Sequence, residues 1–279
     1  MEIRTCQTNS GPLEYSIYGE GIPLLLLHGG HGNAREMMTH RFLDPAQFTL
    51  ITPSRPGYGG TPLSQNKSPV AAARQIEELM QKLPYEQYNL IGISAGGPTA
   101  IALAGLYPER VTKLVLESAV THRWLRPGDA LYTKGKRLFH PRIESVTWAM
   151  LRFFLRLFPG KIIRMIAEEL SAGSFASFSP DEIQRMKAML HNQRSGSGFV
   201  TDLEHELPAN LINKVVAPTL IVHSKNDLVV GPDHPKHAQK FIPNAKTIWL
   251  DNKWGHLIWM GETAQGIIGQ VSKFLLETP

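Results

Sequence analysis

The sequence predicts an α/β fold, in which helices flank a mostly parallel sheet and an all-helical segment interrupts the strand pattern. Strand and helix candidates alternate over the first third of the 279 residues and again after Pro208. Such alternation is typical of a parallel sheet that is covered on both faces. The continuous apolar run at residues 22–29, "IPLLLLHG", suits a strand that is buried on both sides.

The first third supplies five strand candidates and two helix candidates. The strand candidates are residues 13–19, 22–29, 48–54, 88–94 and 111–118. A helix is expected from Pro69 to Leu83, because Ser68 can cap it and proline suits the first helical position. A second helix is expected over the small and apolar residues 96–107.

The middle of the chain contains helix candidates only. Ser179 and Glu182 have the spacing of a capping box, which predicts a helix from there to Leu190. After Pro208 the alternation resumes, with strands at 217–224 and 245–251 and helices at 235–241 and about 262–276. We therefore expect a core at residues 1–120, a helical insertion at 121–210, and the rest of the core at 211–279.

Composition indicates a globular protein of the cytoplasm. The chain is 42% hydrophobic and 19% charged, as is ordinary for a globular domain. Its single cysteine, Cys6, has no internal disulfide partner, which fits a reducing compartment. The first 21 residues contain no basic segment followed by an apolar run and a small-residue cleavage site, so we expect no signal peptide. No uncharged apolar run reaches the ~20 residues that cross a bilayer, so we expect no transmembrane segment.

The charge of the chain is concentrated in one region. The net charge is +5, and residues 123–164 hold ten basic side chains against Asp129 and Glu144. No nucleic-acid motif accompanies them, so we expect no nucleic-acid partner. The favoured interpretation is a solvated outer helix face, and the alternative is a patch for an anionic partner. The apolar stretch "WAMLRFFLRLF" likewise favours a helix packed over a pocket, with a membrane-active lid as the alternative.

Ser94 stands in "GISAG", directly after one strand candidate and before a helix candidate. That context is the one a nucleophile elbow requires, in which a sharp turn exposes a serine at the carboxyl edge of a sheet. Bulky side chains two residues before or after the serine would collide in such a turn, which explains Gly92 and Gly96.

Partners for this serine occur at the ends of the later strands. Asp227 follows the strand at 217–224, and His256 follows the strand at 245–251. Since the carboxyl ends of parallel strands lie at one edge, we expect His256 to act as the base that Asp227 orients. The amides of Ala95 and of Gly30, in the loop "HGGHGN", are the expected oxyanion donors.

These motifs resemble the α/β-hydrolase fold superfamily along essentially the whole chain. The resemblance rests on "HGG", "SRPGYGGT", "GISAG", "KNDLVV" and "GH", in that order. It implies about eight strands and a helical cap at residues 121–210 that roofs the pocket. Haloalkane dehalogenases and epoxide hydrolases place Asp at the elbow, where this chain has Ser94. Prolyl aminopeptidases usually have Pro and Trp where this chain has His31 and Ala95.

The resulting expectation is a carboxylesterase-like serine hydrolase that cleaves a small or medium hydrophobic ester through an acyl-enzyme. Carbon–carbon bond hydrolysis, amide or aminopeptide hydrolysis and peracid formation can use the same triad. A ligand-binding or signalling protein with this fold is a further alternative. Glu117, at the end of the preceding strand, is the alternative triad acid. The oligomeric state is left open.

No cofactor is expected, and no metal, because His223, His234 and His237 follow no metal-ligand spacing that we can name. Five side chains are expected to line the substrate pocket, one from the oxyanion loop and four aromatic ones from the insertion: His31, Trp124, Trp148, Phe153 and Phe154.

Overall fold

The computed structural model describes residues 2–37 and 39–277 and contains one eight-stranded sheet within them. The strand order is β1-β2-β4-β3-β5-β6-β7-β8. The pairs β1–β2 and β2–β4 are antiparallel, and every other neighbouring pair is parallel. The mostly parallel α/β fold class is thus confirmed. The strands are β1 (Glu2–Thr8), β2 (Gly11–Tyr18), β3 (Ile22–Leu27), β4 (Phe48–Pro53), β5 (Tyr88–Ile93), β6 (Val111–Glu117), β7 (Thr219–Ser224) and β8 (Lys246–Leu250).

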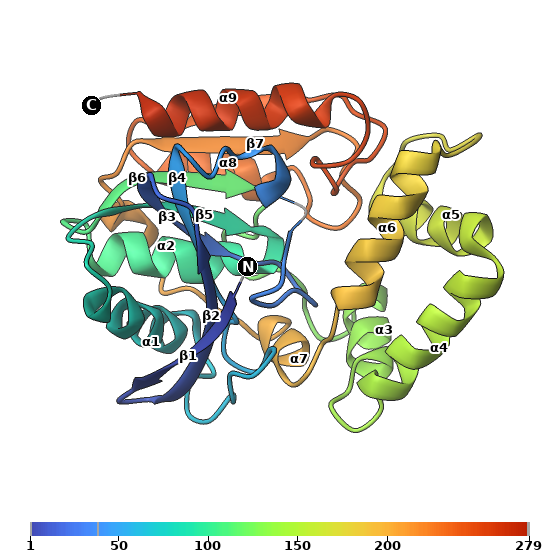
Figure 1. Ribbon diagram of the computed structural model, residues 1–279, viewed down its shortest axis with the longest axis horizontal. Helices are drawn as coiled ribbons and strands as arrows, with labels where there is room; N and C mark the ends of the chain where they lie inside the picture. Colours follow the sequence, from blue (N-terminus) through green and yellow to red (C-terminus); the bar gives the residue numbers. More distant parts are fainter. Residues whose placement is uncertain (1, 38, 278–279) are drawn as a thin grey trace.

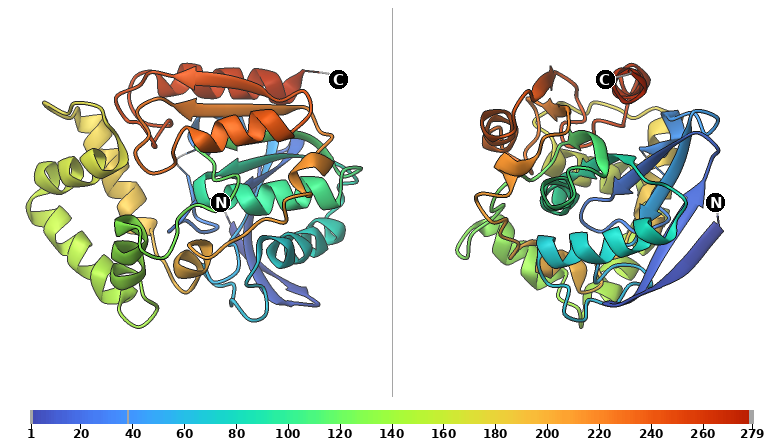
Figure 2. Two further views of the ribbon diagram at one scale, coloured as in Figure 1. Left: turned by 180° about the vertical axis from the view of Figure 1, so that it is seen from behind. Right: turned by 90° about the vertical axis from the view of Figure 1, so that its left-hand side faces the viewer.

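Helices cover both faces of the sheet (Figures 1 and 2). On one face, α1 (Pro69–Lys82), α2 (Gly97–Leu106) and α8 (Asp233–Phe241) pack on side chains such as Leu25 and Leu27. On the other face, α9 (Ala264–Leu276) packs on the alternate positions Leu24 and Leu26. Burial of both faces explains why β3 is apolar without a period of two.

Local capping fixes the starts of two helices as expected. Ser68 Oγ accepts a hydrogen bond from the N–H of Ala71 at 3.2 Å, with Pro69 at the first position of α1. In α6 (Pro180–Asn192), Ser179 and Glu182 form the reciprocal capping box, at 3.1 and 2.9 Å. The structure extends α6 two residues beyond the expected end at Leu190.

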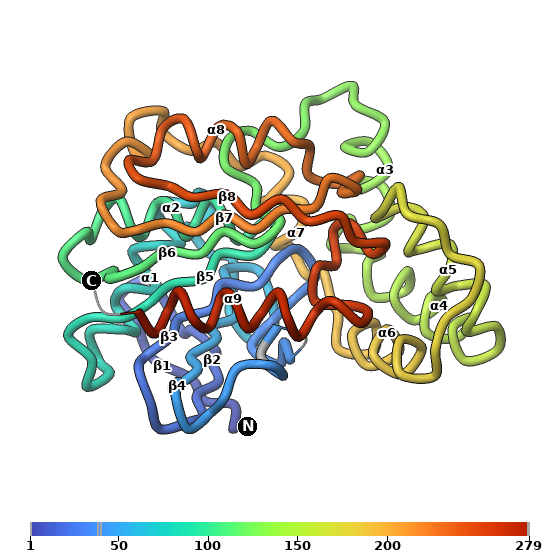
Figure 3. Tube along the Cα trace, turned by 90° about the horizontal axis from the view of Figure 1, so that it is seen from above, coloured from blue at the N-terminus to red at the C-terminus, as the bar shows by residue number. Residues whose placement is uncertain are grey.

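Five helices connect β6 to β7 in the described part of the chain. They are α3 (Ala130–Leu138), α4 (Glu144–Leu157), α5 (Pro159–Leu170), α6 and α7 (Gly198–Asp202). Figures 1 and 3 show α3 to α6 grouped beyond the carboxyl ends of the parallel strands, with α4 and α5 farthest from the sheet. Within the described residues, no helix combines the length and the apolar character that a membrane span needs.

Candidate active site

Ser94 occupies the turn between β5 and α2 with a left-handed backbone, at φ +48°. A Cβ at Gly92 would lie 2.5 Å from Ala100 Cβ, and one at Gly96 would lie 2.4 Å from the carbonyl oxygen of Leu27. Both positions therefore exclude larger residues for a definite steric reason. The strained φ of a non-glycine residue at this turn is a feature that clusters at functional sites.

The loops after β7 and β8 bring Asp227 and His256 to this serine. His256 Nε2 lies 3.0 Å from Ser94 Oγ, and His256 Nδ1 lies 2.8 Å from Asp227 Oδ2. A carboxylate only accepts, so Nδ1 carries the proton and Nε2 is left to accept the hydroxyl proton of Ser94. All three residues are buried. The distances are those of a nucleophile, its base and the group that orients the base.

The environment of Asp227 keeps this carboxyl group ionised. Burial acts to raise its pKa, but the charge and hydrogen bond of His256 outweigh burial and hold the pKa below the usual value. Its other oxygen, Oδ1, accepts hydrogen bonds from the N–H groups of Val229 and Val230, at 2.8 and 2.9 Å. These donors also fix the rotamer of Asp227, and so the orientation of the imidazole.

Glu117, the alternative acid, is buried at the end of β6 and has another partner. Its Oε2 accepts a 2.7 Å hydrogen bond from Trp259 Nε1. Burial raises the pKa of Glu117 to about 7, in spite of the opposing effect of that hydrogen bond. His256 Nδ1 is hydrogen-bonded to Asp227, whereas Glu117 is hydrogen-bonded to Trp259.

The segment after β3 packs directly against the elbow. A Cβ at Gly29 would lie 3.0 Å from Ser94 Cβ, and one at Gly30 would lie 4.0 Å from Ala95 Cβ. The structure thereby brings the backbones of the two expected oxyanion donors, Gly30 and Ala95, together beside the serine.

Arg55 anchors this segment, a role that the sequence did not reveal. Its Nε donates to the carbonyl oxygen of His28 at 2.8 Å, and its Nη1 and Nη2 donate to both carboxylate oxygens of Asp202 at 2.8 and 2.7 Å. Burial would raise the pKa of Asp202, but the charge of Arg55 lowers it below the usual value. The motif "SRPGYGG" was visible in the sequence, yet no local pattern points to Asp202 in α7 as its partner.

An apolar cavity of about 710 Å³ lies over Ser94 and His256. Its wall includes Gly30 and four of the five expected pocket residues, namely His31, Trp124, Trp148 and Phe154. The prediction is wrong for Phe153, the fifth of these residues: its side chain is 58% exposed and does not line the cavity. Neighbouring helical residues point about 100° apart, so Phe153 and Phe154 face different sides of α4.

His31 is the polar residue of the aromatic wall. Trp148 Nε1 donates to Ser195 Oγ at 2.8 Å, and the same oxygen lies 2.8 Å from His31 Nδ1. The hydroxyl proton of Ser195 can therefore be donated to His31 Nδ1, which leaves the imidazole proton on Nε2. Burial lowers the pKa of His31 to about 3. His31 is thus a neutral ring, stacked on Phe199 with centroids 4.0 Å apart.

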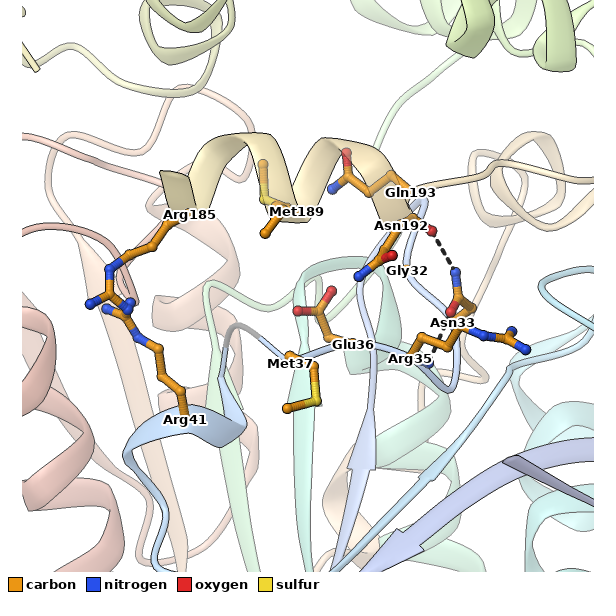
Figure 4. Close-up of a pocket in the computed structure, with 11 residues that line it drawn as sticks. Gly32, Asn33, Arg35, Glu36, Met37, Arg41, Arg185, Met189, Asn192 and Gln193 are labelled. Atoms are coloured by element: carbon orange, nitrogen blue, oxygen red, sulfur yellow. Dashed lines mark hydrogen bonds between the residues drawn. The ribbon is translucent and has the colours of Figure 1, made fainter. Parts of the chain in front are cut away.

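A smaller cavity of about 170 Å³ adjoins the large one, between α6 on one side and residues 32–37 and Arg41 on the other. The two share part of their walls, namely Gly32, Glu36, Met189 and Gln193. Figure 4 shows Arg41 and Arg185 approaching each other at one end of the smaller cavity. Both cations lie over the ring of Phe42, at 4.0 and 6.0 Å.

Two of the histidines considered above for a metal site lie in or beside one polar cluster. Candidate ligand atoms of His122, Asp233 and His234 lie within 4.8 Å of one another, and the His237 ring centroid is 4.8 Å from that of His122. His234 Nδ1 accepts a 3.1 Å hydrogen bond from the N–H of Thr121, which places the proton of the neutral ring on Nε2. A neutral His234 in this arrangement has no lone pair left for a metal ion.

Comparison with known proteins agrees with this architecture. A family model described as alpha/beta hydrolase fold matches residues 22–263. The uncharacterized hydrolase YcgS of Bacillus subtilis is 38% identical over 268 residues, which cover 94% of each chain. A poly(3-hydroxyalkanoate) depolymerase of Ectopseudomonas oleovorans is 28% identical over 263 residues, covering 91% of this chain and 84% of the relative.

A solved structure shows the same fold. It is an alpha/beta hydrolase fold protein from Nakamurella multipartita, with a TM-score of 0.79 at 23% sequence identity, over 98% of this chain and 99% of that chain. The family match spans most of the sequence. This chain belongs to the alpha/beta hydrolase fold family.

Proposed function

We propose that this hydrolase cleaves small or medium hydrophobic carboxylic esters, with Ser94 as nucleophile. The observation that carries the proposal is the hydrogen-bonded chain Ser94–His256–Asp227 at the base of the 710 Å³ cavity. The cavity wall is mainly apolar and aromatic, which suits an apolar acyl or alkyl group. That one relative is a poly(3-hydroxyalkanoate) depolymerase also favours ester chemistry.

The proposed reaction has two halves. Ser94 Oγ attacks the ester carbonyl carbon while His256 Nε2 takes the hydroxyl proton, and the N–H groups of Gly30 and Ala95 stabilise the oxyanion. The intermediate collapses, and His256 returns the proton to the leaving alkoxide, so that an alcohol departs. Water then attacks the acyl-enzyme, with His256 again accepting and returning the proton. The products are a carboxylic acid and free Ser94.

Turnover of p-nitrophenyl esters of increasing acyl length, beside the matching p-nitroanilides, tests this proposal. We expect hydrolysis of the esters, with kcat/KM rising with acyl length until the cavity is filled. Ser94→Ala should lose about 10⁴- to 10⁶-fold in kcat. Ser145→Ala, an exposed serine on α4, is the matched control and should keep wild-type turnover. Faster cleavage of the anilides, or ester turnover that survives Ser94→Ala, would contradict the proposal.

A further inference from the structure

The outer face of α4 carries an apolar stripe that nothing in the described protein covers. Four side chains of α4 and the residue before it form the stripe, spaced three and four residues apart, and each is between 45% and 58% exposed: Ile143, Val146, Met150, Phe153 and Leu157. Three- and four-residue spacing places them on one side of the helix. Phe158, 51% exposed, continues the stripe where α5 begins.

The opposite side of α4 is already used for packing. Trp148 and Leu155 are buried in the core cluster beneath the helix. The helix is therefore apolar on two sides, and only the inner side is explained by the fold. Single exposed apolar residues are ordinary, but a contiguous exposed patch marks an interaction surface.

Basic side chains lie close to the stripe along the chain, and Lys161 lies over the Phe158 ring at 5.8 Å. Arg142, Arg156, Lys161 and Arg164 are exposed, and none forms an ion pair within residues 2–37 and 39–277. Other charges nearby are partly neutralised, since Lys134 pairs with Glu169 and Lys136 with Glu204. Glu168 on α5 is the remaining exposed acidic group of these two helices. An apolar stripe with unpaired cations at its flanks is the composition of helices that lie on anionic bilayers.

The exposed apolar stripe adjoins the cavity wall, because the ring centroids of Phe153 and Phe154 are 5.4 Å apart and Phe154 lines the cavity. Leu131, Leu138, Phe154 and Met165 line the cavity and are also between 38% and 46% exposed. An apolar molecule that reaches the outside of α3, α4 and α5 thus meets the same side chains that form the cavity wall. Figures 1 and 3 show α4 and α5 on the side of the molecule farthest from the sheet.

We propose that the outer face of α4 and the start of α5 docks on an anionic lipid surface. The apolar stripe enters the boundary between head groups and acyl chains, and the long basic side chains extend to the phosphates. Docking itself does not depend on ester chemistry. The idea that the surface delivers lipophilic esters to the cavity rests on the function proposed above.

A second copy of the chain fits this face less well than a bilayer. A two-fold interface would place the same patch on both partners. The exposed cations Arg142, Arg156, Lys161 and Arg164 would then face the same four cations of the partner. Like charges across an interface are unfavourable, whereas an anionic lipid surface neutralises them.

Vesicle cosedimentation tests the proposal, with neutral phosphatidylcholine vesicles beside vesicles that also contain phosphatidylglycerol. We expect the wild-type protein to bind the anionic vesicles and to be released by salt. Phe153→Gln should weaken binding roughly tenfold, because the apolar area entering the lipid is lost. Val216→Gln, at a position 66% exposed and outside the insertion, is the matched control and should bind like the wild type.

A double variant that removes two positive charges tests whether the basic side chains contribute to lipid binding. Arg156→Gln combined with Arg164→Gln should weaken binding by about fivefold for each charge removed. The same changes at the exposed Lys225 and Lys246, which lie outside the patch, should have little effect. All variants are checked for wild-type thermal unfolding, so that a folding defect is recognised.

Three results would overturn the proposal: no binding to anionic vesicles, binding that Phe153→Gln leaves unchanged, or a dimer in light scattering that Phe153→Gln dissociates. The last would assign the face to a second copy. The binding assay needs no turnover, and Ser94→Ala should bind vesicles like the wild type. A wild-type protein that binds vesicles but hydrolyses no ester would therefore count against the proposed function alone.

Discussion

Asp227 and Glu117 show how two buried carboxyl groups at neighbouring strand ends acquire opposite properties. Asp227 accepts hydrogen bonds from His256 and from two backbone N–H groups, and its pKa is lowered. Glu117 receives a hydrogen bond from neutral Trp259, and burial raises its pKa to about 7. In the proposed reaction, the carboxylate that is hydrogen-bonded to His256 stabilises the imidazolium that forms when Ser94 attacks. We therefore assign the acid role to Asp227.

This assignment is tested by comparing Asp227→Asn with Glu117→Gln. Asp227→Asn should lower kcat about 10⁴-fold, because an amide stabilises neither the required tautomer nor the imidazolium. Glu117→Gln should stay within about tenfold of the wild type, since a Gln side-chain oxygen can still accept from Trp259. Steady-state kinetics with a p-nitrophenyl ester measure both. An active Asp227→Asn beside an inactive Glu117→Gln would move the acid role to Glu117.

Glu117 also predicts a pH dependence of stability. Its folded pKa is raised to about 7 from about 4.5 in the unfolded chain, so the folded state binds the proton more tightly. The stability that this group contributes is present below about pH 4.5 and is lost as pH rises to about 7. Glu117→Gln remains neutral throughout, and its unfolding free energy relative to wild type should rise by about 2.5 kcal/mol between pH 5 and pH 8. Denaturant unfolding at both pH values would measure it, and a pH-independent difference would contradict the raised pKa.

Among the elements, Arg55 joins the segment after β3 to the end of α7. The bidentate hydrogen bonds of Arg55 to Asp202 connect residues that are 147 positions apart in the sequence. Because Arg55 Nε also donates to the carbonyl oxygen of His28, the same side chain holds the segment beside Ser94. Both charged side chains are fully buried, at 2% and 3% exposure. Removing one partner leaves a buried charge without compensation.

Asp202→Asn should therefore lower the free energy of unfolding by about 3–5 kcal/mol. The control is Glu169→Gln, which breaks the exposed ion pair with Lys134 and should cost at most about 1 kcal/mol. Chemical denaturation at neutral pH compares the two. Equal and small effects in both variants would show that the Arg55–Asp202 pair does not hold this segment.

Element types were predictable wherever local chemistry determines them. The caps of α1 and α6 depend on side chains within three residues of the helix start, so the sequence predicts them correctly. Strand β1 was not predicted, because an edge strand with exposed and half-buried positions has no apolar run. The orientation of Phe153 and Phe154 could not be predicted either, because α4 is apolar on two sides and its phase is set by distant packing.

At the scale of the whole molecule, the parallel sheet assembles the candidate site. Ser94, Asp227 and His256 are far apart in sequence but follow β5, β7 and β8, whose carboxyl ends meet at one edge. This general property of parallel sheets allowed the three residues to be predicted together. The Arg55–Asp202 pair and the cavity wall depend on how the insertion packs on the core, which no local pattern specifies.

If Ser94 is a nucleophile that His256 activates, it reacts covalently with a fluorophosphonate. The protein is incubated with a fluorophosphonate, digested, and mapped by mass spectrometry. We expect a single adduct on the peptide containing Ser94, absent from Ser94→Ala and strongly slowed in His256→Ala. An adduct at another serine, or labelling of equal rate in Ser94→Ala, would contradict the claim.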